Sequence, residues 1–320
     1  MLCRKNLINM KHYTHIKDLS DLKTTIKDAI LLKMDPFKNQ DIGKNKTLMM
    51  LFFNSSLRTR LSTEKAAKNL GMSVMTLDIN NVWKLEFEDG SVMNMNSTEH
   101  IKEAAHVISQ YADIIAIRAF PTLTDKNKDE SELILKSFIK YATVPIISME
   151  SATGHPLQSL TDAITISEFT EKRKPRVVLT WAPHPKALPQ AVANSFIETM
   201  QLMDVDFTIT HPKGYELNPE TVKDSNVTYN QNEALKDADF VYAKNWSSYT
   251  NYGQILNQDT NWKITKEKLG QAKFMHCLPV RRNVVVDDDV LDSDQSIVIQ
   301  QANNRTFAAQ IVLKNILEQL

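Results

Sequence analysis

The sequence predicts an α/β fold with two domains, each a parallel sheet flanked by helices. Short runs rich in β-branched and other apolar residues alternate with helical patterns along the 320 residues. Such alternation is typical of βαβ units, in which helices cover both faces of a parallel sheet. We count nine candidate strands, which are many for one sheet in a chain of this length, so we expect two sheets.

The candidate strands are Thr47–Phe53, Val74–Asp78, Asp113–Arg118, Val144–Ser148, Val177–Trp181, Asp206–Thr210, Phe240–Ala243, Phe274–Cys277 and Ile297–Gln300. The clearest helical patterns are Leu61–Leu70, Glu99–Tyr111, Ser131–Tyr141, Leu157–Glu171, Leu188–Met203 and Thr306–Leu320.

The composition excludes several classes of protein. With 38 basic and 38 acidic side chains the formal net charge is zero, so no overall field attracts nucleic acid or a membrane surface. An anionic substrate must therefore be bound by local arginines. No apolar run is long enough to span a bilayer, and the N-terminus lacks the layout of a signal peptide. Residues Met1 to Met10 show no pattern and are interpreted as an extension ahead of a start at Met10.

Cysteine, histidine and glycine exclude further classes. The two cysteines, Cys3 and Cys277, cannot form a disulfide framework, which indicates a reducing compartment and predicts a cytoplasmic protein. The eight histidines lack the paired spacing of a zinc site, so no metal is expected, and no cofactor either. The seven glycines form no dinucleotide fingerprint, which disfavours a Rossmann dehydrogenase.

A phosphate site is predicted where the first strand turns into a helix. Ser56–Arg60 lies between the apolar run Thr47–Phe53 and the helical pattern Leu61–Leu70. A helix N-terminus has unpaired N–H groups and the positive end of the helix dipole, and this one adds two arginines and two hydroxyls. Such a site suits a phosphate. The alternative is a serine-capped helix with two solvated arginines.

Polar residues follow other predicted strands at equivalent places. Because ligands of parallel sheets bind beyond the carboxyl ends of the strands, these residues are candidates for one site: Ser56, Arg118, Glu150, His155, His184, Lys244 and the segment from His276 to Arg281.

Three motifs resemble those of the carbamoyltransferases in kind, order and spacing: Ser56-x-Arg58-Thr59-Arg60, His155-Pro-Leu-Gln158 and His276-Cys-Leu-Pro279. The resemblance covers nearly the whole chain. The segments Trp181–Pro185 and Tyr242–Trp246 look like the branch that carbamoylates N-acetyl- or N-succinylornithine.

The resemblance implies a role for each matching residue. The phosphate would be held by Ser56, Leu57, Arg58 and Thr59. The carbamoyl oxygen would face Arg118, His155 and Arg305. The carbamoyl NH₂ would be held by Gln158 and by backbone carbonyls near Cys277 and Leu278. Taken singly, Arg118 could form a strand-end salt bridge, His155 could cap a helix, and Arg305 could start the last helix. A thiol at a strand end is more often inert than nucleophilic, so no covalent catalysis by Cys277 is expected.

One departure predicts the acceptor. Ordinary ornithine carbamoyltransferases carry an acidic residue where this chain has Lys244, and a Ser-Met-Gly segment where it has Ser247-Ser248-Tyr249. A cation there repels an α-ammonium and suits an α-carboxylate, so the expected acceptor is an Nα-acylated ornithine. The alternative is a solvated lysine. The residues expected to hold the acceptor are Glu150, His184, Lys244 and Arg281.

The acyl group is assigned from the loop that contains Trp83. In the family this loop reaches a neighbouring subunit, which implies a homotrimer with Trp83 acting in the neighbour's carbamoyl phosphate site. The acetyl-preferring branch tends to have an acid at the position aligned with Thr98, so the uncharged Thr98 favours N-succinylornithine. A one-residue slip to Glu99 would restore the acid and reverse this preference.

The resemblance also implies the domain organisation. Residues 1–150 would bind carbamoyl phosphate, residues 151–304 would bind the acylornithine, and residues 305–320 would pack back on the first domain as a helix. A trefoil knot is expected around the proline-rich loop Trp181–Gln190.

The sequence is thus interpreted as an enzyme of arginine biosynthesis that carbamoylates the δ-amine of an acylornithine. The alternatives are an ordinary ornithine or aspartate carbamoyltransferase and a catalytically silent regulatory paralogue.

Overall fold

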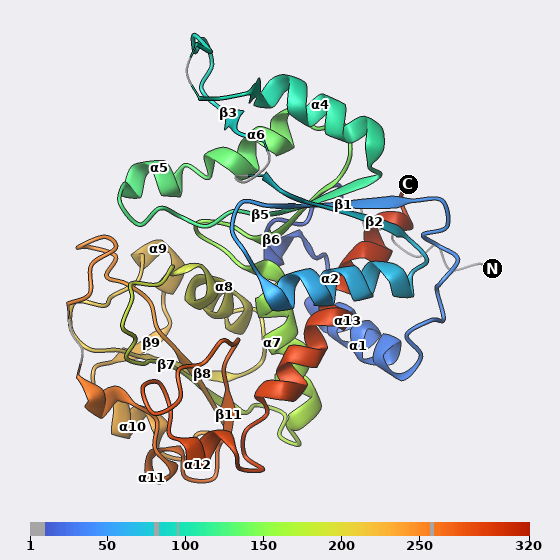
Figure 1. The fold of residues 1–320 in the computed structure, drawn as a ribbon. Helices are drawn as coiled ribbons and strands as arrows, with labels where there is room; N and C mark the ends of the chain where they lie inside the picture. The colour runs from blue at the N-terminus through green and yellow to red at the C-terminus, as the bar shows by residue number, and fades with distance from the viewer. Residues whose placement is uncertain (1–9, 80–82, 95, 257–258) are drawn as a thin grey trace.

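Two parallel sheets organise the chain (Figure 1). A computed structural model describes residues 10–79, 83–94, 96–256 and 259–320. The first sheet has the order β2-β1-β5-β6 and the second the order β11-β10-β7-β8-β9. The strands of the first sheet are β1 (Thr47–Phe52), β2 (Ser73–Asp78), β5 (Ile114–Arg118) and β6 (Ile146–Glu150). Those of the second are β7 (Arg176–Trp181), β8 (Asp206–Thr210), β9 (Asn226–Thr228), β10 (Phe240–Lys244) and β11 (Lys273–Met275). A separate short pair joins β3 (Leu85–Glu86) to β4 (Glu99–His100).

The longer helices cover both sheets and lie between them. They are α1 (Leu22–Met34), α2 (Leu57–Asn69), α4 (Ile101–Tyr111), α6 (Leu133–Tyr141), α7 (Pro156–Phe169), α8 (Ala191–Met200) and α13 (Val298–Leu317). The short ones are α5 (Lys126–Glu130), α9 (Pro219–Val222), α10 (Gln231–Leu235), α11 (Lys266–Leu269), α12 (Asp288–Leu291) and the 3₁₀ turns Ile16–Asp18 and Thr260–Trp262. In the described part of the chain, no helix combines the length and the apolar character needed to cross a bilayer.

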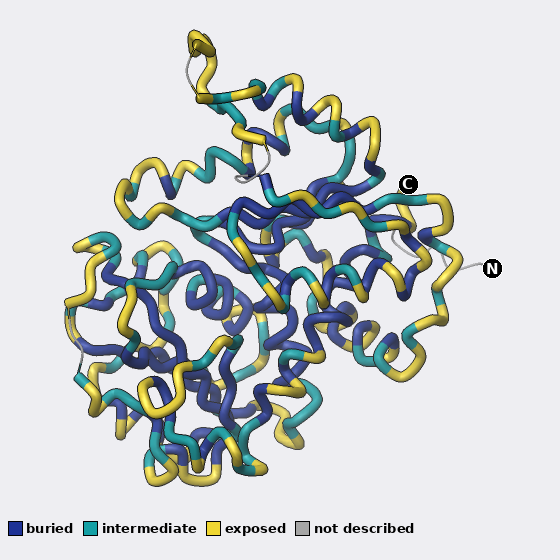
Figure 2. The backbone as a smooth tube through the Cα atoms, in the orientation of Figure 1, coloured by how far each residue is buried: buried dark blue, intermediate teal, exposed yellow. Residues whose placement is uncertain are grey.

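Strand β1 lies inside the first sheet and is buried on both faces. Its side chains alternate between two apolar clusters, as the pleat requires. Leu48 and Met50 lie in the cluster that includes side chains of α7 and α13, and Met49 and Leu51 lie in the cluster that includes side chains of α4 and α6. The tube in Figure 2 accordingly shows β1, β5 and β6 as largely buried, whereas the residues of the edge strand β2 are exposed or half-buried. The apolar run that predicts this strand is therefore confirmed.

The predicted strand Ile297–Gln300 is wrong. Helix α13 begins at Val298, and only Ser296 forms a single bridge to Phe274 beside β11. The first turn of α13 buries Val298 and leaves Ile299 69% exposed. This short apolar run, which reads equally as strand or buried helix, is the start of the last helix. Arg305 therefore lies well inside α13 instead of at its first residue.

Helix α13 connects the two halves of the site. It packs against α1, α2 and α7, and α7 in turn packs against β6 and α8. From α13, Arg305 contacts Thr59 at the start of α2 and Gln158 at the start of α7, the helix starts that carry the first two sequence motifs.

Candidate active site

A cavity of about 1270 Å³ lies where strands of both sheets end. It is bounded by the start of α2 and by residues at or after the ends of β1, β5, β6, β7, β10 and β11. The structure brings together in its lining most of the site residues predicted from the sequence. These are Ser56, Leu57, Arg58, Thr59, Arg118, Glu150, His155, Gln158, His184, Lys244, Cys277, Leu278, Arg281 and Arg305.

Two predicted site residues lie apart from this cavity. Trp83 and Thr98 belong to the arm that carries β3 and β4, which projects from the first sheet in Figure 1. The indole of Trp83 is 46% exposed and donates from Nε1 to Glu99 Oε2 at 2.6 Å. Thr98 is exposed and donates its backbone N–H to the carbonyl of Lys84 at 2.8 Å. Neither side chain lines the cavity of its own chain.

The N-terminus of α2 forms one wall of the cavity. Ser56 is the N-cap, and its hydroxyl accepts the backbone N–H of Thr59 at 3.3 Å. The helix begins at Leu57, four residues earlier than predicted, so Arg58 lies in its first turn. The first turn of any helix leaves N–H groups without intrahelical partners. The positive charge of Arg58 and the unpaired N–H groups of the helix end therefore both favour the binding of an anion at this wall of the cavity.

A buried arginine is held beside this wall by the backbone. Arg118 donates from Nη1 to the carbonyl oxygens of Asn54 at 3.0 Å and Ser55 at 2.6 Å. Its guanidinium also lies over the ring of Phe120, 4.1 Å from the centroid. These contacts fix the planar group at the end of β5. The role of Phe120 was missed from the sequence, where its place directly beyond the strand that carries Arg118 was the available signal.

Glu150 joins Arg118 to His155 at the end of β6. The Arg118 Nη2 atom lies 3.2 Å from Glu150 Oε2, and His155 Nε2 lies 3.5 Å from the same oxygen. All three side chains are buried. Burial raises the pKa of Glu150, and Arg118, Arg305 and Lys244 act in the opposite direction.

His155 is a neutral imidazole at pH 7. Burial lowers its pKa well below the usual value, and the cations Arg305, Arg118 and Lys244 lower it further. Its Nδ1 atom is buried and has no hydrogen-bond partner among the described residues. It is the N-cap residue of α7, yet its side chain makes no capping bond. His155 also lines the cavity.

Arg305 ties α13 to both of the first two motifs. It donates from Nη2 to Thr59 Oγ1 at 2.8 Å and from Nη1 to Gln158 Oε1. Arg305 lies 246 residues from Thr59 along the chain. The tertiary fold therefore assembles donors from α2, α7 and α13 beside Arg118 and His155.

On the opposite wall, Lys244 is a buried cation. It is 6% exposed and donates from Nζ to the carbonyl of Asn245 at 2.8 Å. Burial lowers its pKa, and Glu150 acts in the opposite direction. No carboxylate within salt-bridge distance pairs with it in the described part of the chain. A ligand carboxylate would supply the missing counter-charge.

His184 and Asn245 shape the same wall. The ring of His184 lies next to Lys186, whose backbone N–H contacts Nδ1 at 3.0 Å. Asn245 donates from Nδ2 to the carbonyl of Ala182 at 2.7 Å, which ties the end of β10 to the end of β7. Burial lowers the pKa of His184. The structural role of Asn245 was missed, although it lies within a motif.

The His276–Pro279 segment lines the cavity directly after β11. Leu278 has a φ of +55°, which is uncommon for a residue with a side chain, and its N–H is held by His276 Nδ1 at 2.9 Å. Burial lowers the pKa of His276 to about 3. Burial raises the pKa of the Cys277 thiol, so this group stays protonated near neutral pH. A protonated thiol is a poor nucleophile.

The residues that the structure describes form no evident metal-binding site. No group of three or more His, Cys, Asp and Glu side chains is arranged there to hold a metal ion.

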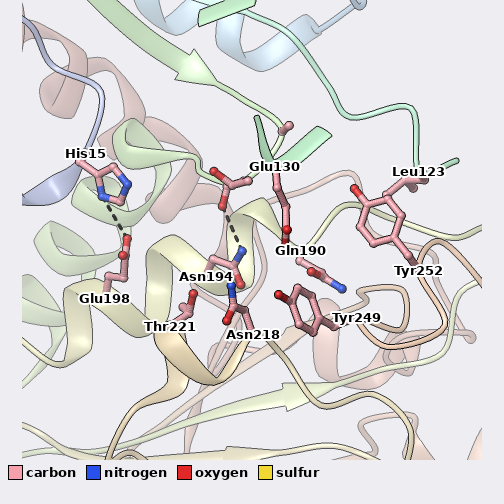
Figure 3. Close-up of a pocket in the computed structure, with 12 residues that line it drawn as sticks. His15, Leu123, Glu130, Gln190, Asn194, Glu198, Asn218, Thr221, Tyr249 and Tyr252 are labelled. Carbon is pink, nitrogen blue, oxygen red and sulfur yellow. Dashed lines mark hydrogen bonds and ion pairs between the residues drawn. The ribbon is translucent and has the colours of Figure 1, made fainter. Parts of the chain in front are cut away.

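A second cavity, of about 320 Å³, is shown in Figure 3. Several polar groups of its lining are already paired. His15 Nδ1 lies 3.3 Å from Glu198, Asn194 donates to the carbonyl of Thr153 at 3.1 Å, and Tyr252 donates to Asp129 at 2.9 Å. These contacts hold neighbouring segments together, and we assign no ligand to this cavity.

The chain matches two domains of a known protein family. The chain matches the carbamoyl-P binding domain of the aspartate/ornithine carbamoyltransferases over residues 11–168, and their Asp/Orn binding domain over residues 189–316.

Full-length relatives agree with these domain matches. The chain is 53% identical to the N-succinylornithine carbamoyltransferase of Bacteroides thetaiotaomicron, with 97% of this chain and all of the relative covered. It is 35% identical to the N-acetylornithine carbamoyltransferase of Xanthomonas campestris pv. campestris, with 96% and 97% covered.

Solved structures are also similar. An acetylornithine transcarbamylase complexed with acetylcitrulline superposes with a TM-score of 0.90 at 34% identity, with 95% of this chain and 98% of the other covered. A mutant N-acetyl-L-ornithine transcarbamylase complexed with carbamyl phosphate and N-succinyl-L-norvaline gives 0.89 at 34% identity and the same coverage. With two domain matches in order and full-length relatives, the chain belongs to the aspartate/ornithine carbamoyltransferase family.

Proposed function

We propose that this protein transfers the carbamoyl group of carbamoyl phosphate to the δ-amine of an Nα-acyl-L-ornithine, giving an acylcitrulline and phosphate. N-Succinylornithine is the favoured acceptor, and the reaction serves arginine biosynthesis in the cytoplasm. The observation that carries the proposal is the buried Lys244, which faces the cavity without a carboxylate partner among the described residues. The 53% identity to an N-succinylornithine carbamoyltransferase supports the same acceptor.

Carbamoyl phosphate binds at the start of α2. Its phosphate accepts hydrogen bonds from the backbone N–H groups of Ser56, Leu57, Arg58 and Thr59 and from the side chains of Ser56, Arg58 and Thr59. The helix N-terminus and the guanidinium of Arg58 stabilise the negative charge.

The carbamoyl carbonyl is polarised by three donors. Arg118, neutral His155 and Arg305 hydrogen-bond its oxygen, and they stabilise the oxyanion that forms when the amine attacks. Each such donor contributes about 3 kcal/mol to transition-state stabilisation. Because these groups are held by the protein before the reaction, they do not need to reorganise during it.

The carbamoyl NH₂ group fixes the orientation of the substrate. It donates to Gln158 Oε1 and to backbone carbonyls near Cys277 and Leu278. The δ-nitrogen of the acceptor attacks the carbonyl carbon, the C–O bond to phosphate breaks, and the departing phosphate takes up the amine proton. No side chain of the protein has to act as a general base.

The acceptor lies against the second sheet. Lys244 pairs with its α-carboxylate, and Glu150, His184 and Arg281 complete the contacts. Free ornithine would bring an α-ammonium close to Lys244, and two like charges at short range in a buried site repel strongly. Acylation of the α-amine removes that charge.

In a homotrimer, the arm of a neighbouring subunit completes the site, with Trp83 at the carbamoyl phosphate and Thr98 at the acyl group. Trp83 and Thr98 lie on the projecting arm and do not line the cavity of their own chain. This placement supports a role for both residues in the site of a neighbouring subunit. Thr98→Glu should lower turnover of N-succinylornithine and spare N-acetylornithine, because the new carboxylate repels the succinyl carboxylate. Equal loss with both acceptors would remove Thr98 from the acyl pocket.

We also propose a division of the chain into domains. We place the carbamoyl phosphate domain at residues 1–150, the acylornithine domain at 151–304 and the returning helix at 305–320, with a trefoil knot around 181–190. Ser247 is hydrogen-bonded to this loop: its N–H donates to the carbonyl of Leu188 at 2.9 Å, and its carbonyl accepts from Gln190 Nε2 at 2.9 Å.

One assay tests the proposed reaction. Purified protein is given carbamoyl phosphate with ornithine, N-acetylornithine, N-succinylornithine or aspartate at equal concentration, and phosphate release and the carbamoylated product are both measured. We expect N-succinylornithine to be used best and ornithine hardly at all. Efficient use of ornithine or aspartate would refute the acceptor assignment, and no turnover with any acceptor would favour a silent paralogue.

A further inference from the structure

Below the proposed carbamoyl site, one buried carboxylate contacts two glutamines. Asp162 lies on α7, one turn after Gln158, and has no exposed surface. Its Oδ1 atom accepts a hydrogen bond from Gln158 Nε2 at 2.7 Å and another from Gln301 Nε2 at 2.7 Å. Gln301 belongs to α13, so this oxygen joins two helices.

Each glutamine then presents its own carbonyl oxygen in the opposite direction. Gln158 Oε1 accepts from Arg305 Nη1 and lies at the cavity wall. Gln301 Oε1 accepts from the backbone N–H of His276 at 2.9 Å. The network therefore runs from Asp162 to the two places where the carbamoyl NH₂ is proposed to bind.

We propose that Asp162 is a positioning residue that fixes the amide orientation of Gln158 and Gln301. An ionised carboxylate oxygen can accept a hydrogen bond but cannot donate one, so both glutamines must turn their NH₂ groups towards it. A flip of Gln158 would place two acceptor oxygens against each other and two donors, Nε2 and Arg305, against each other. The inference rests on the proposed function, because it gives Gln158 Oε1 the carbamoyl NH₂ as its partner.

The Oδ1 atom keeps this role in either protonation state of Asp162. Burial raises the pKa of the carboxyl group to about 7, and the hydrogen bonds of Gln301, Gln158 and the Tyr242 hydroxyl act in the opposite direction. A proton on Oδ2 would leave Oδ1 an acceptor. An asparagine with its amide nitrogen at the position of Oδ2 would therefore preserve the orientation of both glutamines.

The test compares Asp162→Asn with Asp162→Leu, which has a similar shape but no acceptor. Thr165→Val is the matched control, because Thr165 is also buried on α7 and accepts a hydrogen bond from Asn304 of α13 at 3.0 Å. Calorimetry measures the affinity for carbamoyl phosphate and for inorganic phosphate. Turnover is measured with the best acceptor.

We expect Asp162→Leu to weaken carbamoyl phosphate binding and to lower kcat by about 10²-fold, as expected for a misplaced contact to the reacting group. Affinity for inorganic phosphate should stay unchanged, and both Asp162→Asn and Thr165→Val should behave as wild type. A purely structural role would weaken both ligands together, and that result would overturn the proposal. So would an Asp162→Asn protein as impaired as Asp162→Leu.

If Asp162→Leu does not fold, Asp162→Ala replaces it. The two binding measurements need no acceptor, so they test the positioning role even if no acylornithine is carbamoylated. Failure of the proposed function is recognised separately, by the absence of turnover in the wild-type protein.

Discussion

Replacing Lys244 by methionine should weaken acceptor binding and, at the same time, stabilise the empty protein. Methionine matches the length of the aliphatic stem and removes only the charged end. The carboxylate of the acceptor would lose its counter-charge. The free protein would lose a buried cation whose one hydrogen-bonding partner among the described residues is the carbonyl of Asn245. The two effects have opposite signs, which makes the prediction specific.

The magnitude follows from burial. Lys244 is 6% exposed, so its interaction with a ligand carboxylate is poorly screened by water. Truncating one partner of a buried, hydrogen-bonded charge pair costs about 2–5 kcal/mol, or roughly 30-fold to several thousand-fold in affinity. The burial that lowers the pKa of Lys244 also opposes folding, so Lys244→Met should leave the stability unchanged or raise it by about 1 kcal/mol or more.

The assay is steady-state kinetics with carbamoyl phosphate held saturating and N-succinylornithine varied, together with thermal unfolding without ligands. We expect a large fall in kcat/KM for the acceptor, little change in the affinity for carbamoyl phosphate, and an equal or higher Tm. Lys186→Met is the matched control, since Lys186 is an exposed lysine at the edge of the same cavity. An unchanged KM for the acceptor, or a Tm several degrees lower than that of wild type, would refute the reasoning.

Three further predictions follow from the site. Arg58→Ala should lower kcat/KM for carbamoyl phosphate by about 10²–10³-fold with the fold intact; near-normal turnover at limiting carbamoyl phosphate would remove this helix end from the site. Refolding Trp83→Ala together with inactive Arg118→Ala should restore some activity, because mixed trimers contain sites with neither change; no recovery in verified mixed oligomers would contradict a shared site. The pKa of His276 is about 3 in the folded protein and about 6.5 when exposed, so the free energy of unfolding falls as the pH drops below 6.5. Between pH 7 and 5, urea unfolding should show a loss of this free energy that is about 2 kcal/mol larger in wild type than in His276→Asn.

Local patterns were sufficient for most of the fold. Eight of the nine candidate strands coincide with strands of the two sheets, because buried parallel strands are short apolar runs bounded by turns. The ninth, Ile297–Gln300, is the start of α13. Strand β9 (Asn226–Thr228) was missed because it is only three residues long, largely exposed and polar at both ends. Short edge elements of this kind carry little periodic signal.

Part of the candidate site could also be predicted from local sequence. The phosphate wall is local, since Ser56 and Arg58 belong to one strand–helix turn whose N–H groups and dipole follow from the backbone alone. The positions of polar residues at strand ends could also be predicted, because parallel strands share one edge.

The tertiary structure decided which of these groups meet and which carry charge. Arg305 reaches Thr59 across 246 residues only because α13 packs against both α2 and α7. Burial lowers the pKa values of both His155 and Lys244, and the segments that bury them are distant in the sequence. The absence of a carboxylate partner for Lys244 among the described residues likewise depends on which segments surround it. Proximity and burial are properties of the assembled chain, so no motif contains them.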